Sequence, residues 1–273
     1  MTDSTRSLSS KIDQTDIDQV VTTGMAFPFW TVFKREFSAY FRSPVAYFIA
    51  FAVLLLLGVL FNGYVTFAVQ SGNQPADSTT IPGLLVFLMF LIAPLLTMRL
   101  IAEESREGTL EVLMTLPMGE GQFIFGKFLA AWGYYTVLLL LTVVFHLLLT
   151  TIGVPDLGAA FGSYLGAWLY GGAVLAVSMI WSAVTEDQVV AAFLSAATIL
   201  VLYLAEIAAS WVAGQGSVAG VADFVRELGL QAHYNVTLAR GIIRAEDVLY
   251  FVFLIVGALF ITTRIVEIRR WRA

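Results

Sequence analysis

The sequence has no cysteine, two histidines and charged residues at only 13% of its 273 positions. Without cysteine there is no disulfide scaffold and no zinc or iron–sulfur site with thiolate ligands. A soluble domain has about 25% charged residues, so this composition argues against a soluble enzyme, a disordered chain and a nucleic-acid-binding module. Proline is also scarce, and of the seven prolines only Pro94 lies inside a long apolar segment.

What the sequence has in quantity is apolar residues, at 59% of the chain. A helix that crosses a membrane needs about 20 of them in a row. Six segments meet this requirement, at about 45–66, 82–101, 128–151, 161–184, 189–209 and 248–266. We therefore predict an all-α polytopic membrane protein with one membrane domain over 27–273. Residues 1–26 are polar, and we expect them to form a flexible cytosolic tail.

The placement of basic residues predicts the orientation. Six spans put both termini on one side of the membrane. Of the 15 lysines and arginines, only Arg226, Arg240 and Arg244 would then lie on the other side. Because Lys and Arg gather in cytoplasmic loops, we expect a multi-pass membrane protein with both termini in the cytoplasm.

Residues 29–42 form an amphipathic pattern before the first span. On a helical wheel the aromatic residues gather on one side, namely Trp30, Phe33, Phe37, Tyr40 and Phe41, and the opposite side holds Lys34, Arg35, Ser38 and Arg42. An interfacial helix needs this arrangement, with aromatics toward lipid and cations toward headgroups. The alternative is a cytosolic extension of the first span, but Ser43-Pro44 favours a break because Ser caps helices and Pro suits their first turn.

The long cytoplasmic connection 102–127 contains a second amphipathic pattern. Gly108 breaks the preceding helix and Thr109 can cap a new one, whose apolar residues would be Leu110, Leu113, Met114 and Pro117. A short amphipathic helix preceded by charges is suited to bind in a groove of another protein. The alternative is a solvated charged loop.

Other chemistries find little support in the sequence. Residues 121–127 read G-x-x-x-x-G-K, but Phe128 stands where a phosphate-binding loop needs Ser or Thr, so we interpret them as a helix start with Lys127 at the membrane surface. We expect no metal site, because neither His146 nor His233 has a second ligand at helical spacing. His146 is interpreted as a hydrogen-bonded packing residue or part of a polar pathway. The serines of the fourth span, Ser163, Ser178 and Ser182, show no pairing with a histidine.

The external connection 210–247 contains a moderately apolar stretch, Val218 to Leu230, which is too short to span. We expect a half-inserted or surface-lying helical element that packs on the outer end of the bundle. Glu206, near the outer end of the fifth span, is the clearest buried carboxylate. Gly158, Gly162 and Gly166 repeat every four residues, and Ala192 and Ala196 flank Ser195; these small faces predict close helix packing, within the chain or between subunits.

The sequence resembles ABC-2 type permeases, the membrane subunits of ABC transporters. The resemblance rests on the segment Glu103-Glu104-Ser105-Arg106-Glu107-Gly108-Thr109-Leu110-Glu111 through Pro117. Two further segments are similar to the gliding-motility-associated (Gld) branch: Phe33–Tyr47, and His233-Tyr234 with Arg240-Gly241-Ile242-Ile243 and Asp247–Phe251.

The resemblance implies six helices per subunit, an N-terminal interfacial helix, a cytoplasmic coupling helix and short external re-entrant helices. It further implies a non-enzymatic permease that exports a substrate, with ATP and magnesium bound by a partner ATPase and no cofactor of its own. A second permease half, identical or different, would complete the pore, and a membrane subunit with a large external domain is a further expected partner.

Roles follow from the same resemblance. The ATPase-coupling residues would be Glu103, Glu104, Arg106, Glu107, Gly108, Thr109, Leu110, Glu111 and Pro117, and an outer gate would contain Glu206, His233, Arg240 and Asp247. Two alternatives remain: a membrane anchor or assembly subunit that transports nothing, and an ion-coupled carrier or intramembrane hydrolase. The scarcity of buried charges weighs against the latter.

Overall fold

The computed structural model describes residues 29–72, 77–109, 119–214 and 219–270, a part of the chain that contains helices and no strand. Six of these helices are long and apolar enough to cross a membrane, which confirms the six predicted spans. They are α2 (Pro44–Gln70), α3 (Thr80–Thr97), α6 (Glu120–Ile152), α7 (Leu157–Val184), α8 (Gln188–Gly214) and α11 (Ala245–Arg270). The predicted tail, residues 1–26, lies outside the described residues.

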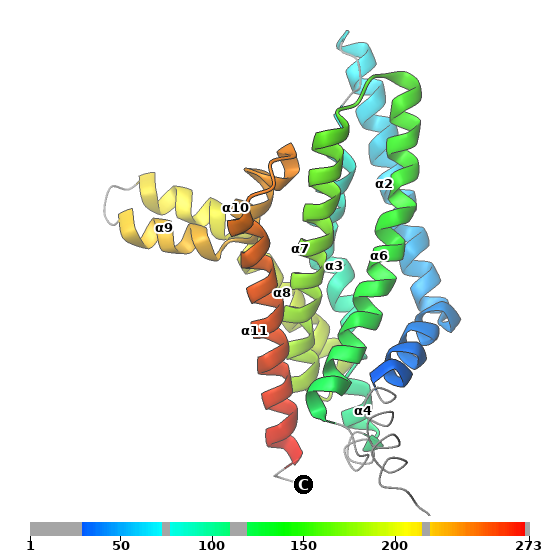
Figure 1. Cartoon of the computed structure of the whole chain (residues 1–273), viewed down its shortest axis with the longest axis vertical. Coiled ribbons are helices and arrows are strands. Elements are labelled where there is room, and N and C mark those ends of the chain that lie inside the picture. Colours follow the sequence, from blue (N-terminus) through cyan, green and yellow to red (C-terminus); the bar gives the residue numbers. More distant parts are fainter. Residues whose placement is uncertain (1–28, 73–76, 110–118, 215–218, 271–273) are drawn as a thin grey trace, which may run out of the picture.

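Helix α7 is the centre of the bundle (Figure 1). Its most apolar stretch is 78% buried, against 28% for α2 and α6 and 22% for α8 and α11. Glycines allow this close packing: a Cβ on Gly171 would lie 2.1 Å from Tyr135 of α6, and one on Gly162 would lie 2.4 Å from the backbone of Gly241. The small-residue face at Gly162 and Gly166 therefore serves packing within the chain.

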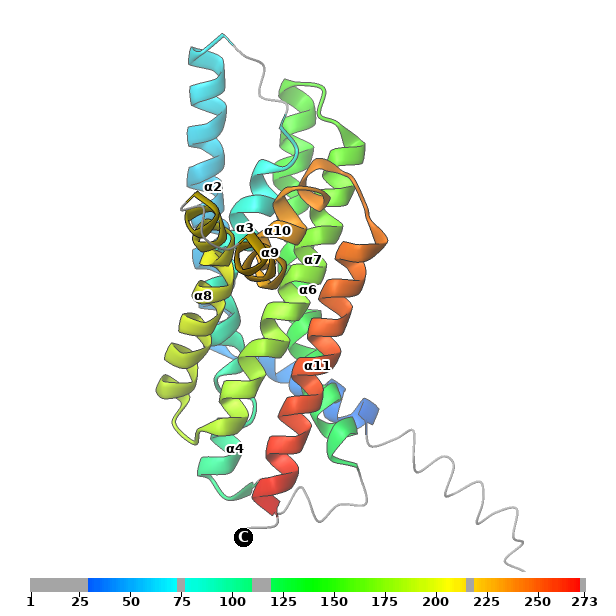
Figure 2. The same ribbon diagram turned by 90° about the vertical axis from the view of Figure 1, so that its left-hand side faces the viewer.

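Short helices occupy the connection between α8 and α11. They are α9 (Ala219–Leu228), α10 (Leu230–Asn235) and the 3-10 turn η1 (Leu238–Arg240). Figures 1 and 2 show the last part of α8 and α9 lying side by side and projecting sideways from the bundle, whereas α10 and η1 pack against α7. The expectation that the whole stretch up to Leu230 packs on the end of the bundle was wrong for α9, because α9 finds its apolar partner in α8.

The amphipathic segment before α2 is a helix over residues 29–42, separated from α2 by Ser43. Its aromatic side packs largely on α6 and not on lipid: Tyr40 stacks on Tyr134, and Phe37 covers Gly133, where a Cβ would lie 3.1 Å from its ring. Trp30, at the start of the helix, is 52% exposed. The two glycines of α6 that receive this helix, Gly126 and Gly133, are seven residues apart and so share one side of α6.

Helix α4 (Ala102–Arg106) follows α3 after a short turn, at the same end of the bundle as the last residues of α11 (Figure 1). The helix 29–42 and the first turns of α6 approach the same region. This end of the molecule, which we call the α4 end, brings together segments from all parts of the chain.

Candidate functional site

Helix α4 has only five residues, and contacts from other helices hold it in place. The backbone N–H groups of Ile101 and Ala102 both donate to Ser182 Oγ of α7, at 3.1 and 3.2 Å. On the other side, Arg269 of α11 donates to Ser105 Oγ at 2.6 Å and to the carbonyl oxygen of Val184. A helix this short is not stable alone, so tertiary contacts position α4.

A buried group of charges adds two more connections. Lys127 of α6 is 1% exposed, and its Nζ lies 2.9 Å from Glu104 Oε1 and 3.2 Å from Glu36 Oε1. Arg35 Nη2 lies 2.6 Å from Glu36 and 3.3 Å from Glu104. We call Arg35, Glu36, Glu104 and Lys127 the α4 charge cluster. It joins α4 to the helix 29–42 and to α6.

The α4 charge cluster has two cations and two carboxylates, so its formal charge balances. Burial opposes the ionisation of Glu36, but the nearby Lys127 and Arg35 outweigh this effect and lower the pKa of the Glu36 carboxyl below its ordinary value of 4.5. Removing one partner from such a group leaves an uncompensated buried charge, which is strongly destabilising. At Glu104 burial outweighs the nearby Lys127 and raises the pKa of the carboxyl above its ordinary value of 4.5, so the two carboxylates are not equivalent.

Lys127 was predicted to lie at the membrane surface, and this level stays a prediction; what the sequence did not predict is that its side chain is buried between helices. The surrounding sequence, Gly126-Lys127-Phe128, resembles any helix entering a membrane, and the partners Glu36 and Glu104 are remote in sequence. One signal was available: a single lysine in an apolar helix needs a partner.

The residues that follow α4 are exposed in the part that the structure describes. Arg106 and Glu107 extend from the end of the helix, and Gly108 adopts a left-handed backbone with φ of +69°. Thr109 Oγ1 donates to the carbonyl oxygen of Glu104 at 3.3 Å. The predicted break at Gly108 is confirmed. Leu110, Glu111 and Pro117 lie outside the described residues, so the coupling helix itself stays a prediction.

The proposed outer-gate residues divide into two groups. His233 Nδ1 lies 3.0 Å from Asp247 Oδ1, and Thr237 donates to Asp247 Oδ2 at 2.6 Å. The His233 ring stacks on Tyr250 with centroids 3.8 Å apart. This His233–Asp247 cluster ties α10 to the start of α11. Among the described residues, no hydrogen bond or ion pair joins Arg240 or Glu206 to the His233–Asp247 cluster. Arg240 is exposed, and the backbone of Glu206 lies beside Gly229.

His146 is not the hydrogen-bonded packing residue that was expected. Both ring nitrogens are buried and lack a hydrogen-bond partner in the described part of the chain, and the ring meets Tyr164 edge-on. Ser182 bonds the α4 backbone and Ser163 donates to Ala160, so neither is paired with a histidine. No hydrolase-like pair of nucleophile and base occurs among the residues described.

Comparison with known proteins agrees with this architecture. A probable ABC transporter permease protein NosY from Pseudomonas aeruginosa is 33% identical over 159 residues, which cover 53% of this chain and 55% of the relative. Its namesake from Stutzerimonas stutzeri is 36% identical over 105 residues, or 36% of this chain and 37% of the relative. The chain thus matches about half or less of the length of these curated relatives.

These relatives are NosY permeases and not members of the gliding-motility-associated branch. The predicted resemblance to that branch was therefore wrong, whereas the resemblance to ABC-2 permeases is confirmed. The family model described as "ABC-2 family transporter protein" matches residues 32–195, which is more than half of the sequence and includes the helix 29–42 from its fourth residue, α4 and the central helix α7. The chain belongs to the ABC-2 family of transporter proteins.

Proposed function

We propose that this chain is the membrane-spanning permease subunit of an ABC exporter, driven by ATP hydrolysis on a separate ATPase subunit. The observation that supports this most is the construction of the α4 end. The segment that leads into the predicted coupling helix contacts α7, α11, α6 and the helix 29–42 through polar groups. A partner that moves this segment would therefore displace four helices together.

In this proposal the ATPase binds the exposed segment after α4, with Arg106 and Glu107 orienting it and the apolar residues from Leu110 onward in its groove. Because α4 is only one turn long, it transmits displacement without bending. A second permease half, identical or different, pairs with this chain in the bacterial inner membrane, with both termini in the cytoplasm.

The connection between α8 and α11, on the external side of the membrane in this proposal, would form the outer gate. Here α9, α10 and η1 act as the external re-entrant element, and the His233–Asp247 cluster holds α10 against α11. Both ring nitrogens of His233 face oxygen acceptors, since Nε2 lies 3.2 Å from the carbonyl oxygen of Glu227. Opening of the gate would separate these contacts.

The first test is purification of the tagged chain from its native membrane in mild detergent, with partners identified by mass spectrometry. We expect an ATP-binding cassette subunit to copurify and to be lost when Glu107 and Leu110 are both changed to alanine. Absence of any ATPase, under conditions that keep other ABC complexes intact, would contradict the proposal.

Coupling is tested with Gly108→Pro in the purified complex. The φ of +69° at Gly108 is closed to proline, whose ring holds φ near −65°, so the segment after α4 must change direction. We expect transport-coupled ATPase activity to fall at least about tenfold, a loss of roughly 1.4 kcal/mol or more in coupling. Gly72→Pro is the matched control, because Gly72 has a similar φ of +72° at the far end of α2.

The same preparation addresses the alternative of an anchor or assembly subunit that transports nothing. Such a subunit would bind the ATPase, but candidate substrates would not stimulate hydrolysis, and Gly108→Pro would leave the basal rate unchanged. Substrate-stimulated hydrolysis that is lost in Gly108→Pro supports the exporter.

A further inference from the structure

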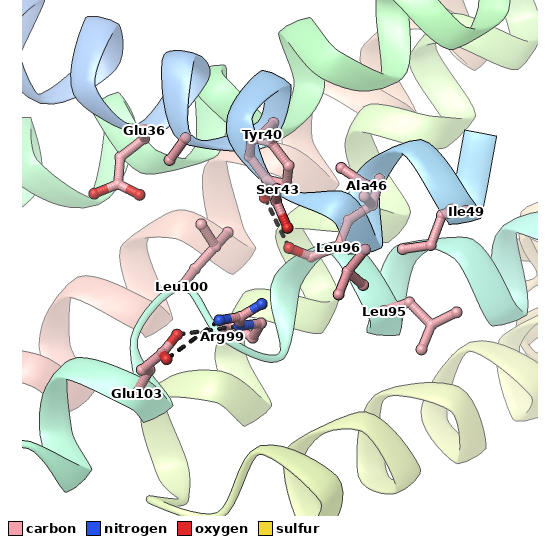
Figure 3. A pocket seen from close by; sticks show the side chains of 12 residues that line it. Glu36, Tyr40, Ser43, Ala46, Ile49, Leu95, Leu96, Arg99, Leu100 and Glu103 are labelled. Carbon is pink, nitrogen blue, oxygen red and sulfur yellow. Dashed lines mark hydrogen bonds and ion pairs between the residues drawn. The ribbon is translucent and has the colours of Figure 1, made fainter. Parts of the chain in front are cut away.

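A cavity of about 190 Å³ lies between the helix 29–42, the first turns of α2 and the end of α3. Figure 3 shows that its two ends differ: Glu36, Arg99 and Glu103 gather at one end, and Ile49 and Leu95 lie at the other. The cavity stands where the apolar spans begin and end, since α2 starts at Pro44 and α3 ends at Thr97. This is the level at which a bilayer changes from headgroups to hydrocarbon.

The charged end offers one donor and one acceptor. Glu103 pairs with Arg99 through Nε and Nη2, at 3.1 and 3.3 Å, and within the described residues Nη1 of Arg99 has no hydrogen bond. The bonds that Glu36 accepts from Arg35 and Lys127 all end on Oε1. Nη1 of Arg99 and Oε2 of Glu36 are therefore available to a ligand that has both an anionic and a cationic group.

The apolar end continues onto the surface of α2. Val45 lines the cavity and is exposed, and at helical spacing it shares one side of α2 with Phe48 and Leu55, which are also exposed. A hydrocarbon chain that leaves the cavity here would follow this side of α2 into the membrane. A soluble ligand would gain nothing from it, so the combination favours a lipid.

We propose that this cavity binds the headgroup of an amine-bearing zwitterionic phospholipid of the phosphatidylethanolamine type. Its phosphate would bind Arg99 Nη1, its ammonium group would bind Glu36, and its acyl chains would lie along the Val45 side of α2. Charge complementarity decides the headgroup. Two carboxylates and one guanidinium line the cavity, and Arg35 and Lys127 reach only Oε1 of Glu36. The free Oε2 therefore favours a cationic donor over an anionic headgroup, and a quaternary ammonium cannot donate a hydrogen bond to it.

Such a lipid would connect the helix 29–42 to α2 and α3, on the side of Glu36 that faces away from Lys127. The α4 charge cluster and the lipid would then share one carboxylate. This lipid site does not depend on the proposed ATPase coupling, and its test uses no ATPase.

The test is native mass spectrometry of the full chain in mild detergent, titrated with phosphatidylethanolamine, phosphatidylglycerol and phosphatidylcholine of identical acyl chains. We expect the ethanolamine lipid to bind at least about tenfold more tightly than the other two, equivalent to roughly 1.4 kcal/mol. Equal binding of all three lipids, or preference for phosphatidylglycerol, would overturn the proposal. Glycerophosphoethanolamine, which lacks the chains, should bind far more weakly; equal affinity would identify a soluble phosphate ester as the occupant instead.

Two variants locate the site. Arg99→Gln removes the phosphate contact and should weaken binding of all three lipids. Ala39→Trp fills the cavity without changing a charge and should abolish the preference for the ethanolamine lipid. Arg264→Gln is the matched control, because Arg264 also pairs with a nearby glutamate at the α4 end, in an exposed position. If Arg99→Gln does not fold, Ala39→Trp decides the question alone. Retained preference in Ala39→Trp would exclude this cavity as the site.

Discussion

Lys127 carries a buried charge, and burying a charge costs free energy unless it is paired. A nearly inaccessible ammonium group is tolerated only because Glu36 and Glu104 approach it to about hydrogen-bond distance. The same three residues belong to three different helices. The chemistry of one side chain thus determines how the α4 end is assembled.

Replacing Lys127 by Met should lower the free energy of unfolding by about 3–5 kcal/mol, because Glu36 and Glu104 lose their buried cation and keep only Arg35, whose side chain is 49% exposed. Chemical denaturation in detergent measures this effect. The triple variant Lys127→Met, Glu36→Gln and Glu104→Gln should recover most of the loss, since the charge that remains in the cluster is that of Arg35, which is 49% exposed and can be solvated by water. The exposed control Arg264→Gln should change stability by about 0.5 kcal/mol or less. A Lys127→Met loss as small as the control would contradict the cluster.

Glu36 should make stability depend on pH. Its pKa in the folded protein is lower than the ordinary 4.5, so its ionised form stabilises the fold above pH 4.5. That contribution is lost as the pH falls through the lowered pKa. The melting temperature of the wild-type protein should therefore exceed that of Glu36→Gln at pH 7, and the difference should shrink below pH 4.5. A difference that is constant from pH 7 to pH 3.5 would show that ionisation of Glu36 contributes nothing.

At the scale of elements, α7 organises the bundle through residues with no side chain. Its glycines admit Tyr135 and Trp132 from α6 on one side and η1 with Gly241 on the other. Small residues at four-residue spacing were readable from the sequence. Which helix they meet was not, because a subunit interface requires the same pattern as packing within the chain.

Gly162→Ala should destabilise the protein by about 1–3 kcal/mol, the usual cost of overpacking. The new Cβ would lie 2.4 Å from Gly241 Cα and 3.0 Å from the carbonyl oxygen of Leu238, and backbone atoms cannot rotate away. Thermal unfolding in detergent measures the change. Gly63→Ala is the control, because a Cβ there meets nothing within 4 Å. Equal melting temperatures of the two variants would refute the close contact of α7 with η1.

On the scale of the whole molecule, the six spans and the basic-residue count predict that the α4 end lies in the cytoplasm. The absence of native cysteine makes this directly measurable. Single cysteines at Glu107, beside α4, and at Val154, between α6 and α7 and 89% exposed, should react differently with a membrane-impermeant maleimide in intact cells. We expect labelling of Val154→Cys alone, and of both after permeabilisation. Labelling of Glu107→Cys in intact cells would reverse the orientation.

Local sequence patterns were enough to predict the number and approximate position of the spans, the break at Gly108 and the helix before α2. Each of these depends on neighbours within one or two turns, because burial in hydrocarbon requires a continuous apolar segment and helix ends depend on local caps and glycines. The pairing of His233 with Asp247 was also within reach, since both flank one short connection.

Local patterns did not predict that Lys127 is buried, that the aromatic side of the helix 29–42 covers α6, or that α9 pairs with α8; these depend on how the helices pack. In the first two cases the partner comes from a distant segment: Glu36 and Lys127 are 91 positions apart. Helices α8 and α9 are consecutive in the sequence, but the direction in which the chain turns between them is a matter of tertiary packing. A lysine at a membrane surface and a lysine buried between two carboxylates can have the same local sequence. What distinguishes them is whether carboxylates from other helices lie close enough to offset the free-energy cost of burying the charge.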